Sequence, residues 1–221
     1  MTTKKTLQNR LNTFKKQVTI YPVSCERLAN GRSDYEWLEA VLAGGAKIVQ
    51  LRDKESDDRR LYSKAVIFRE KTSRAGCLLI INNRLDIALA VDADGVHLGN
   101  SDLPAAEARR LAPDIIIGVS ANTEAQAASA ASRGASYFNI GPIYPTKTKE
   151  GLTDFLGLAA IARFSARSEL PFTVMGGIKF RHIEQLTGLG VRRIAVVTAI
   201  SQAPDIAAET KKWYEKIHES C

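Results

Sequence analysis

The amino-acid sequence predicts an α/β protein that folds as a single-domain (β/α)8 TIM barrel with a short N-terminal helical extension. Eight short apolar runs alternate with longer amphipathic segments along the chain, as strands and helices do when they follow one another. Such regular alternation indicates parallel strands joined by right-handed crossovers. The 221 residues lie near the compact end of the range for this barrel, and no Pro-, Gly- or Ser-rich linker divides them.

An open, doubly wound sheet is the alternative fold. It requires a glycine-rich fingerprint directly after the first strand. Neither G-x-G-x-x-G nor G-x-x-x-x-G-K occurs anywhere in the sequence. The closed barrel is therefore the better prediction.

The strands are predicted at the apolar runs. In chain order these are Val18–Val23, Ala46–Leu51, Cys77–Ile81, Gly95–Leu98, Ile115–Val119, Tyr137–Ile140, Phe172–Met175 and Ile194–Val197. In a barrel of this kind the functional residues lie where the strands end or where the following loops begin. The strand ends are therefore the places to look for chemistry.

The helices are predicted between the strands. They are Ser33–Ala43, Ser56–Arg74, Leu85–Val91, Ala105–Leu111, Thr123–Arg133, Phe155–Ser168, Phe180–Thr187 and Asp205–Glu219. Ser33 and Ser56 stand before acidic residues and can cap the helices that follow. Gly76 and Gly134 are typical helix ends.

The net charge of +7 is unevenly distributed. Residues 1–17 contain five basic and no acidic side chains, which leaves a net charge of +2 for residues 18–221. A protein that binds nucleic acid through its folded surface would carry a basic stripe there, so no nucleic-acid partner is expected. We predict a basic, solvated and partly helical extension at 1–17 and the catalytic barrel at 18–221, with an anion-attracting arm as the alternative for the extension.

The cysteines and the hydropathy point to the cytoplasm. Cys25, Cys77 and Cys221 are far apart and form no C-x-x-C pair, which argues against a zinc knuckle or a disulfide framework. No run of 18 apolar residues is present, and the basic N-terminus has no apolar stretch after it. We therefore expect neither a membrane partner nor a secretory signal.

The end of the second strand carries a candidate anion site. Strand alternation places Gln50, Arg52 and Lys54 on one side of the sheet. An arginine that binds as a fork beside a lysine that acts as a point charge suits a diphosphate. The alternative is that these are rim charges paired with Asp53 or Glu55.

The next two strand ends are more ambiguous. Asn82 and Asn83 can bind a heterocycle or orient a metal-bound group, although Asn83 can equally cap the helix that follows. His97 is flanked by apolar residues, which favours a packed, hydrogen-bonded histidine. Asp102 is either a helix cap or an oxygen ligand for Mg²⁺, which usually takes one or two carboxylates together with substrate phosphates.

The remaining strand ends favour phosphate binding. Ser120 lacks the G-x-S-x-G context of a hydrolase nucleophile and is better suited to donate to a ligand. Thr148 and Lys149 follow two prolines in a loop that can fold over a phosphate, with a solvated loop as the alternative. The Gly176-Gly177 pair and the end of the eighth strand lie where this fold most often binds phosphate. Two phosphate-binding regions at one end of the barrel indicate an enzyme with two substrates.

Taken in order, these motifs resemble the thiamine phosphate synthase family, also called thiamine-phosphate pyrophosphorylase, from Val18 to Ser201. The segments that carry the resemblance are Gln50-Leu51-Arg52-Asp53-Lys54, Ile81-Asn82-Asn83-Arg84, Asp94-Gly95-Val96-His97-Leu98-Gly99 with Asp102, Gly118-Val119-Ser120, Gly141-Pro142-Ile143-Tyr144-Pro145-Thr146 with Thr148-Lys149, Gly176-Gly177-Ile178 and Val197 to Ser201. No single motif is decisive, but their order is specific.

The resemblance implies a transferase. It would condense 4-amino-5-hydroxymethyl-2-methylpyrimidine diphosphate with 4-methyl-5-(2-phosphoethyl)thiazole, carboxylated or not, to give thiamine monophosphate and pyrophosphate. The implied pyrimidine diphosphate ligands are Gln50, Arg52, Lys54, Asn82 and Ser120. The implied ligands of the thiazole phosphate or the departing pyrophosphate are Thr146, Thr148, Lys149, Gly177, Val197 and Thr198. Arg52, Lys54, Ser120 and Lys149 would be catalytic, and no general base is required because the thiazole nitrogen already carries a lone pair.

The resemblance also implies Mg²⁺ as cofactor, held by Asp102. Where the family carries a second metal-binding aspartate, this chain has Asn83, whose amide oxygen can coordinate but brings no charge, so we expect a weakened site. Thr198 replaces the usual serine and keeps its hydroxyl. A thiazole tautomerase-like isomerase and a non-catalytic binder of thiamine precursors remain the alternative functions; the sequence leaves the oligomeric state open.

Overall fold

A parallel, eight-stranded barrel forms the centre of the computed structural model, which describes residues 6–146, 148 and 154–220. The strands are β1 (Ile20–Pro22), β2 (Ile48–Leu51), β3 (Leu78–Asn82), β4 (Gly95–Leu98), β5 (Ile116–Ala121), β6 (Tyr137–Ile140), β7 (Phe172–Met175) and β8 (Ile194–Val196). From β2 to β8 each strand pairs in parallel with the next, and β1 pairs with β8. A bridge between Val23 and Gln50 joins the remaining edges. The predicted fold class is confirmed.

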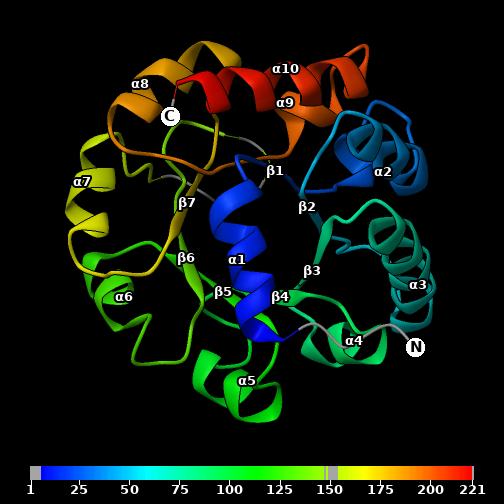
Figure 1. The fold of residues 1–221 in the computed structure, drawn as a ribbon, viewed down its shortest axis with the longest axis horizontal. Helices are drawn as coiled ribbons and strands as arrows, with labels where there is room; N and C mark the ends of the chain where they lie inside the picture. The colour runs from blue at the N-terminus through cyan, green and yellow to red at the C-terminus, as the bar shows by residue number, and fades with distance from the viewer. Residues whose placement is uncertain (1–5, 147, 149–153, 221) are drawn as a thin grey trace.

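The helices surround the barrel (Figure 1). They are α1 (Leu7–Gln17), α2 (Asp34–Ala43), α3 (Asp58–Arg74), α4 (Leu85–Ala90), α5 (Ala105–Leu111), α6 (Glu124–Ser129), α7 (Ala159–Ser165), α8 (Ile183–Gly188), α9 (Thr198–Ser201) and α10 (Ile206–Glu219), with 3-10 turns η1 (Glu26–Leu28) and η2 (Phe180–His182). Ser33 forms the predicted cap of α2, where its hydroxyl accepts from the Glu36 amide. The predicted cap at Ser56 is wrong by one residue, because Asp57 caps α3. The short α9 was not predicted.

Alternation along the strands divides the core into two layers. Ile48, for example, packs inside the barrel, whereas Val49 packs outward between the strands and the helices. The inner layer also contains Tyr21 and Tyr137. Because Gln50 follows Ile48 by two residues, it points inward as predicted and is 4% exposed.

The N-terminal helix α1 crosses the centre of the barrel at the amino-terminal ends of the strands (Figure 1). Phe14 is fully buried and stacks on Tyr137, with 4.7 Å between the ring centroids. Arg10 is also buried and donates to Asp94 and to the Asp114 carbonyl. The expectation of a solvated segment at 1–17 is therefore wrong for α1, whose Leu7, Leu11 and Phe14 lie on one helical face.

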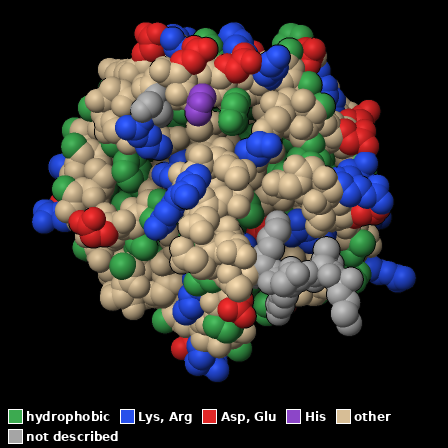
Figure 2. Space-filling model, in the orientation of Figure 1, with side chains coloured by type: hydrophobic (Ala, Val, Ile, Leu, Met, Phe, Trp, Pro, Cys, Tyr) green, Lys and Arg blue, Asp and Glu red, His purple; other side chains and the backbone are tan. Residues whose placement is uncertain are grey.

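Figure 2 shows the same end of the molecule with its side chains coloured by type. Lys and Arg side chains are scattered over this face and alternate with Asp and Glu around its rim. Among the described residues, no helix combines the length and the apolar character needed to cross a membrane. The opposite end of the barrel, where the strands finish, is hollow.

Candidate active site

A cavity of about 580 Å³ opens at the carboxyl ends of the strands. It collects side chains that are far apart in the sequence. Its lining includes these predicted site residues: Gln50, Arg52, Lys54, Asn82, Asn83, Asp102, Ser120, Thr146, Thr148, Gly177, Val197 and Thr198. The remaining predicted residue, Lys149, lies outside the described residues.

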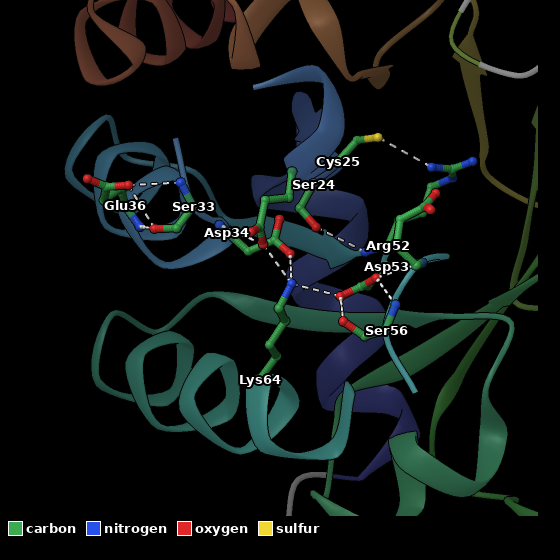
Figure 3. Close-up of polar contacts among 11 residues, drawn as sticks. Ser24, Cys25, Ser33, Asp34, Glu36, Arg52, Asp53, Ser56 and Lys64 are labelled. Atoms are coloured by element: carbon green, nitrogen blue, oxygen red, sulfur yellow. Dashed lines mark hydrogen bonds and ion pairs between the residues drawn. The ribbon is translucent and has the colours of Figure 1, made fainter. Parts of the chain in front are cut away.

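Arg52 enters the cavity without a carboxylate partner in the part of the chain that the structure describes. Its backbone amide donates to the Ser24 hydroxyl at 3.1 Å, and its guanidinium contacts the Cys25 sulfur at 3.6 Å. The alternative that Asp53 pairs with Arg52 is not observed. Figure 3 shows the Asp53 carboxylate directed toward Lys64 and Ser56, whereas the Arg52 side chain extends toward Cys25.

Asp53 lies on the other side of this strand end, where its ionised carboxylate accepts hydrogen bonds at both oxygens. Burial alone would raise its pKa, but the hydrogen bonds from Lys64 and Ser56 outweigh burial and hold the pKa well below its usual value. The positive charge of Arg52 thus remains available on the cavity side, where it can attract an anion.

A chain of hydrogen bonds crosses the floor of the cavity. Its six members, in order, are Asn82, Gln50, Tyr21, Tyr137, His97 and Ser120. The donor–acceptor distances along it lie between 2.9 and 3.2 Å. The chain thereby connects strands on opposite sides of the barrel.

The amide of Gln50 gives this chain a direction. Its Oε1 accepts from Asn82, so its Nε2 donates to the Tyr21 hydroxyl. Burial raises the pKa of Tyr21 and of Tyr137, so both hydroxyls keep their protons. The arrangement that gives each of these protons an acceptor has Tyr21 donating to Tyr137 and Tyr137 donating to Nδ1 of His97.

In this arrangement the neutral ring of His97 carries its proton on Nε2. Burial lowers its pKa to about 4, against a smaller opposing effect of Asp102. The Nε2–H donates to the Ser120 hydroxyl at 3.2 Å, which leaves the Ser120 proton to be donated into the cavity. The sequence predicted a hydrogen-bonded histidine, but it gave no role to Tyr21 or Tyr137; the only signal was a phenol within each apolar run.

The residues beside this chain supply oxygen atoms. The Asn82 Oδ1 is buried and has no hydrogen-bond partner among the described atoms. Asn83 adopts a left-handed conformation with φ of 65° and lines the cavity. The alternative that Asn83 caps the following helix is wrong, because Arg84 occupies that position. Asp102 accepts from the Gly99 amide at 2.6 Å and closes a turn at the rim, whereas the N-cap of α5 is Pro104.

The oxygen atoms of this group of residues fit Mg²⁺ only if substrate phosphates supply further ligands. No group of three or more His, Cys, Asp or Glu side chains suited to a metal occurs among residues 6–146, 148 and 154–220. Asp102 and the amide oxygens of Asn82 and Asn83 are hard oxygen donors, which Mg²⁺ prefers. One carboxylate is sufficient when substrate phosphates supply further ligands.

The opposite wall of the cavity is made of backbone. Gly177 has φ of +65°, and a Cβ there would lie 2.4 Å from the Pro145 carbonyl oxygen. Only glycine therefore allows the loops after β6 and β7 to pack this closely. Val197 is the N-cap of α9, and the Thr198 and Ala199 amides of its first turn have no helical acceptor and suit an anion, whereas those of Ile200 and Ser201 donate to the Val197 carbonyl.

The fold and the cavity define the class of the protein: it is a (β/α)8-barrel enzyme with its chemistry at the carboxyl ends of the strands. Residues 20–200 match the family model described as thiamine monophosphate synthase. The chain belongs to this family.

Individual relatives agree with the family match. The thiamine-phosphate synthase of Pelotomaculum thermopropionicum is 40% identical over 196 residues, which cover 88% of this chain and 90% of the relative. That of Methanospirillum hungatei is 42% identical over 195 residues, covering 88% and 95%. A solved thiamine phosphate pyrophosphorylase from Pyrococcus furiosus superposes with a TM-score of 0.86 at 30% identity, covering 94% of this chain and 98% of that one.

Proposed function

We propose that this protein is a thiamine phosphate synthase. It joins the methylene carbon of 4-amino-5-hydroxymethyl-2-methylpyrimidine diphosphate to the ring nitrogen of 4-methyl-5-(2-phosphoethyl)thiazole, carboxylated or not, and releases pyrophosphate, together with CO2 when the thiazole is carboxylated. One observation carries the proposal: a single cavity contains an arginine without a carboxylate partner among the described residues and, at the ends of β7 and β8, backbone that suits an anion. Two anions can therefore be bound at one site.

The diphosphate belongs on the side of Arg52 and Lys54. The guanidinium can bind two oxygens as a fork, and the ammonium adds a point charge. Asp102 and Asn83 would hold Mg²⁺ beside the same phosphates. When bound, this ion supplies positive charge to the leaving diphosphate.

The pyrimidine ring belongs on the floor of the cavity. The Asn82 Oδ1, which lacks a partner among the described atoms, can accept from the amino group of the ring. Ser120 can donate to a ring nitrogen because His97 donates to Ser120. Gln50 is held between Asn82 and Tyr21 and fixes the orientation of the Asn82 amide.

The thiazole phosphate belongs on the backbone wall. Gly177, Val197 and Thr198 offer amides there, and Thr146 and Thr148 add hydroxyl groups from the facing loop. Lys149 follows in the same loop and is proposed as a further cation. The reacting ends of the two substrates then meet between the two phosphate sites.

The reaction requires positions and charges rather than a base. The bond between the methylene carbon and the diphosphate oxygen breaks, and both electrons leave with the oxygen. The thiazole nitrogen supplies the pair for the new carbon–nitrogen bond, so no proton needs removal. A neutral His97, with a pKa near 4, adds no positive charge next to the electron-deficient carbon, while Arg52 and Lys54 stabilise the leaving group.

The test is an assay of the purified protein with both substrates across a series of Mg²⁺ concentrations. We expect pyrophosphate and thiamine monophosphate in equal amounts, with a requirement for Mg²⁺. No turnover at any Mg²⁺ concentration would contradict the proposal. Isomerisation of the thiazole alone would instead indicate the tautomerase-like function.

The cellular location is proposed from chemistry. Cys25 and Cys77 are buried and form no disulfide bond among the described residues, which suits a reducing compartment such as the cytoplasm.

A further inference from the structure

A cluster of one lysine and three carboxylates lies directly behind the end of β2. Lys64 on α3 contacts Asp53 at 2.7 Å, Asp34 at 2.9 Å and Glu26 at 2.6 Å. The acids come from three segments: the loop after β2, the first turn of α2, and η1. None of these four residues lines the cavity as described, and the reaction uses none of them.

The cluster holds Asp53 on the side away from the cavity. The Asp53 Oδ1 accepts from the backbone amides of Glu55 and Ser56, and its Oδ2 accepts from the Ser56 hydroxyl and from Lys64. The side chain is only 5% exposed. Both oxygens are thus fully used, and Figure 3 shows the carboxylate turned toward Lys64.

Without this arrangement Asp53 would compete with the substrate. It is the immediate neighbour of both Arg52 and Lys54, and an unrestrained carboxylate there is attracted to the same cations as a diphosphate. Lys64 is the only charged donor to Asp53 among the contacts of the described residues. Its loss would leave three carboxylates close together, and their repulsion favours movement of Asp53 toward the cations of the strand end.

We propose that Lys64 is a positioning residue, which keeps Asp53 away from Arg52 and so leaves the guanidinium available to the diphosphate. This inference rests on the proposed function. Lys64 does not touch the substrate; its effect passes entirely through Asp53. Asp34 and Glu26 hold the ammonium group in place from the side opposite the strand.

The experiment measures the affinity of inorganic pyrophosphate, with Mg²⁺, by calorimetry. Lys64→Met is expected to weaken binding about tenfold, since Asp53 then competes for Arg52. In the double variant Lys64→Met with Asp53→Asn the competing charge is gone, and affinity is expected to return to within about twofold of the parent. A purely structural role for Lys64 would give no such recovery.

Kinetics add an independent readout. Lys64→Met is expected to raise the KM for the pyrimidine diphosphate and to leave the KM for the thiazole phosphate unchanged. The matched control is Lys71→Met on the same helix, which removes a surface ion pair with Glu39 and should change neither value. Equal rises in both KM values, or no rise in either, would overturn the proposal.

A second variant covers the case in which Lys64→Met does not fold. Lys64→Gln removes the positive charge beside Asp53 and keeps a neutral donor in its place. It is expected to weaken pyrophosphate binding about threefold, and unchanged binding would then reject the proposal. If the parent protein turns over both substrates but these variants behave like it, only the role of Lys64 fails; if the parent itself has no turnover, the proposed function fails.

Discussion

The arginines at the two ends of the barrel differ in their hydrogen-bond partners. At the amino-terminal end, Arg10 contacts Asp94 and the Asp114 carbonyl, and Arg193 donates to the carbonyls of Phe14 and Lys15. At the carboxyl end, Arg52 has only a sulfur contact from its guanidinium among the described residues. The same side-chain chemistry is satisfied by the protein at one end and exposed to a cavity at the other.

This difference distinguishes arginines that stabilise the fold from an arginine that can bind a ligand. A buried arginine with its partners in place contributes to the folded state, and its removal leaves buried acceptors without one of their donors. An arginine in a cavity without such partners contributes little to folding and can bind a ligand instead. The variants below, in order of expected effect, test whether the two ends behave in these two ways.

The largest effect is expected from Arg52→Met. It removes the cation proposed to bind the leaving diphosphate, so kcat/KM should fall by about 1,000-fold. The melting temperature should change little, because the guanidinium has no carboxylate partner among the described residues. Steady-state kinetics and thermal unfolding measure the two quantities. Activity within a few-fold of the parent would contradict a role of Arg52 in binding the diphosphate.

Arg10→Met tests the structural role of the amino-terminal end of the barrel, which α1 covers. It removes the hydrogen bonds of Arg10 to Asp94 and to the Asp114 carbonyl under α1, and the free energy of unfolding should fall by about 3 kcal/mol. Denaturant titration gives this value, and kcat of the folded variant should stay close to that of the parent. A loss of activity without a loss of stability would contradict the assignment of this end to structure.

The pH dependence of stability tests His97, which lies between the two ends. In the unfolded chain the ring takes up a proton as the pH falls through about 6.5, whereas in the barrel it stays neutral until about pH 4. The unfolded state therefore binds more protons in this window, and the free energy of unfolding falls as the pH falls from about 7 to 4. His97→Gln should reduce this loss by about 2 kcal/mol.

The matched control for this measurement is His218→Gln, because His218 is exposed on α10. It should leave the pH dependence of stability as it is in the parent. If His97→Gln and the parent lose stability in parallel between pH 7 and 4, the neutral state of His97 is wrong.

The smallest effect is expected from Tyr137→Phe, which interrupts the hydrogen-bond chain next to His97. The Nδ1 of His97 loses its donor, the preference for the Nε2–H tautomer weakens, and kcat should fall about tenfold. Nitrogen NMR of the histidine ring in the parent should show the proton on Nε2. A proton on Nδ1 would reverse the direction of the chain and contradict the role given to Ser120.

The sequence predicted the fold and the cavity lining through local patterns. Apolar runs located the strands, and alternation placed Gln50 and Arg52 on the inner side of the barrel. These features depend on neighbours a few residues apart, and such neighbours are visible in a sequence.

Pairings between distant residues were not predictable. Asp94 is the partner of Arg10 across 84 residues, and His97 meets Tyr137 across 40. Sequence reasoning could leave Arg52 as a rim charge paired with Asp53 because nothing in the sequence indicates that Lys64 binds Asp53. Closure of the barrel creates these contacts, and they decide which polar groups remain available to a ligand.

We propose that Arg52, at the open end of the barrel, is kept available for a diphosphate because Asp53 is held away from it. The most direct measurement is the calorimetric affinity of inorganic pyrophosphate, with Mg²⁺, for the parent, Arg52→Met and Arg10→Met, at a temperature where all three are folded. We expect a loss of about 100-fold for Arg52→Met and parental affinity for Arg10→Met. Equal affinities in Arg52→Met and the parent would contradict it.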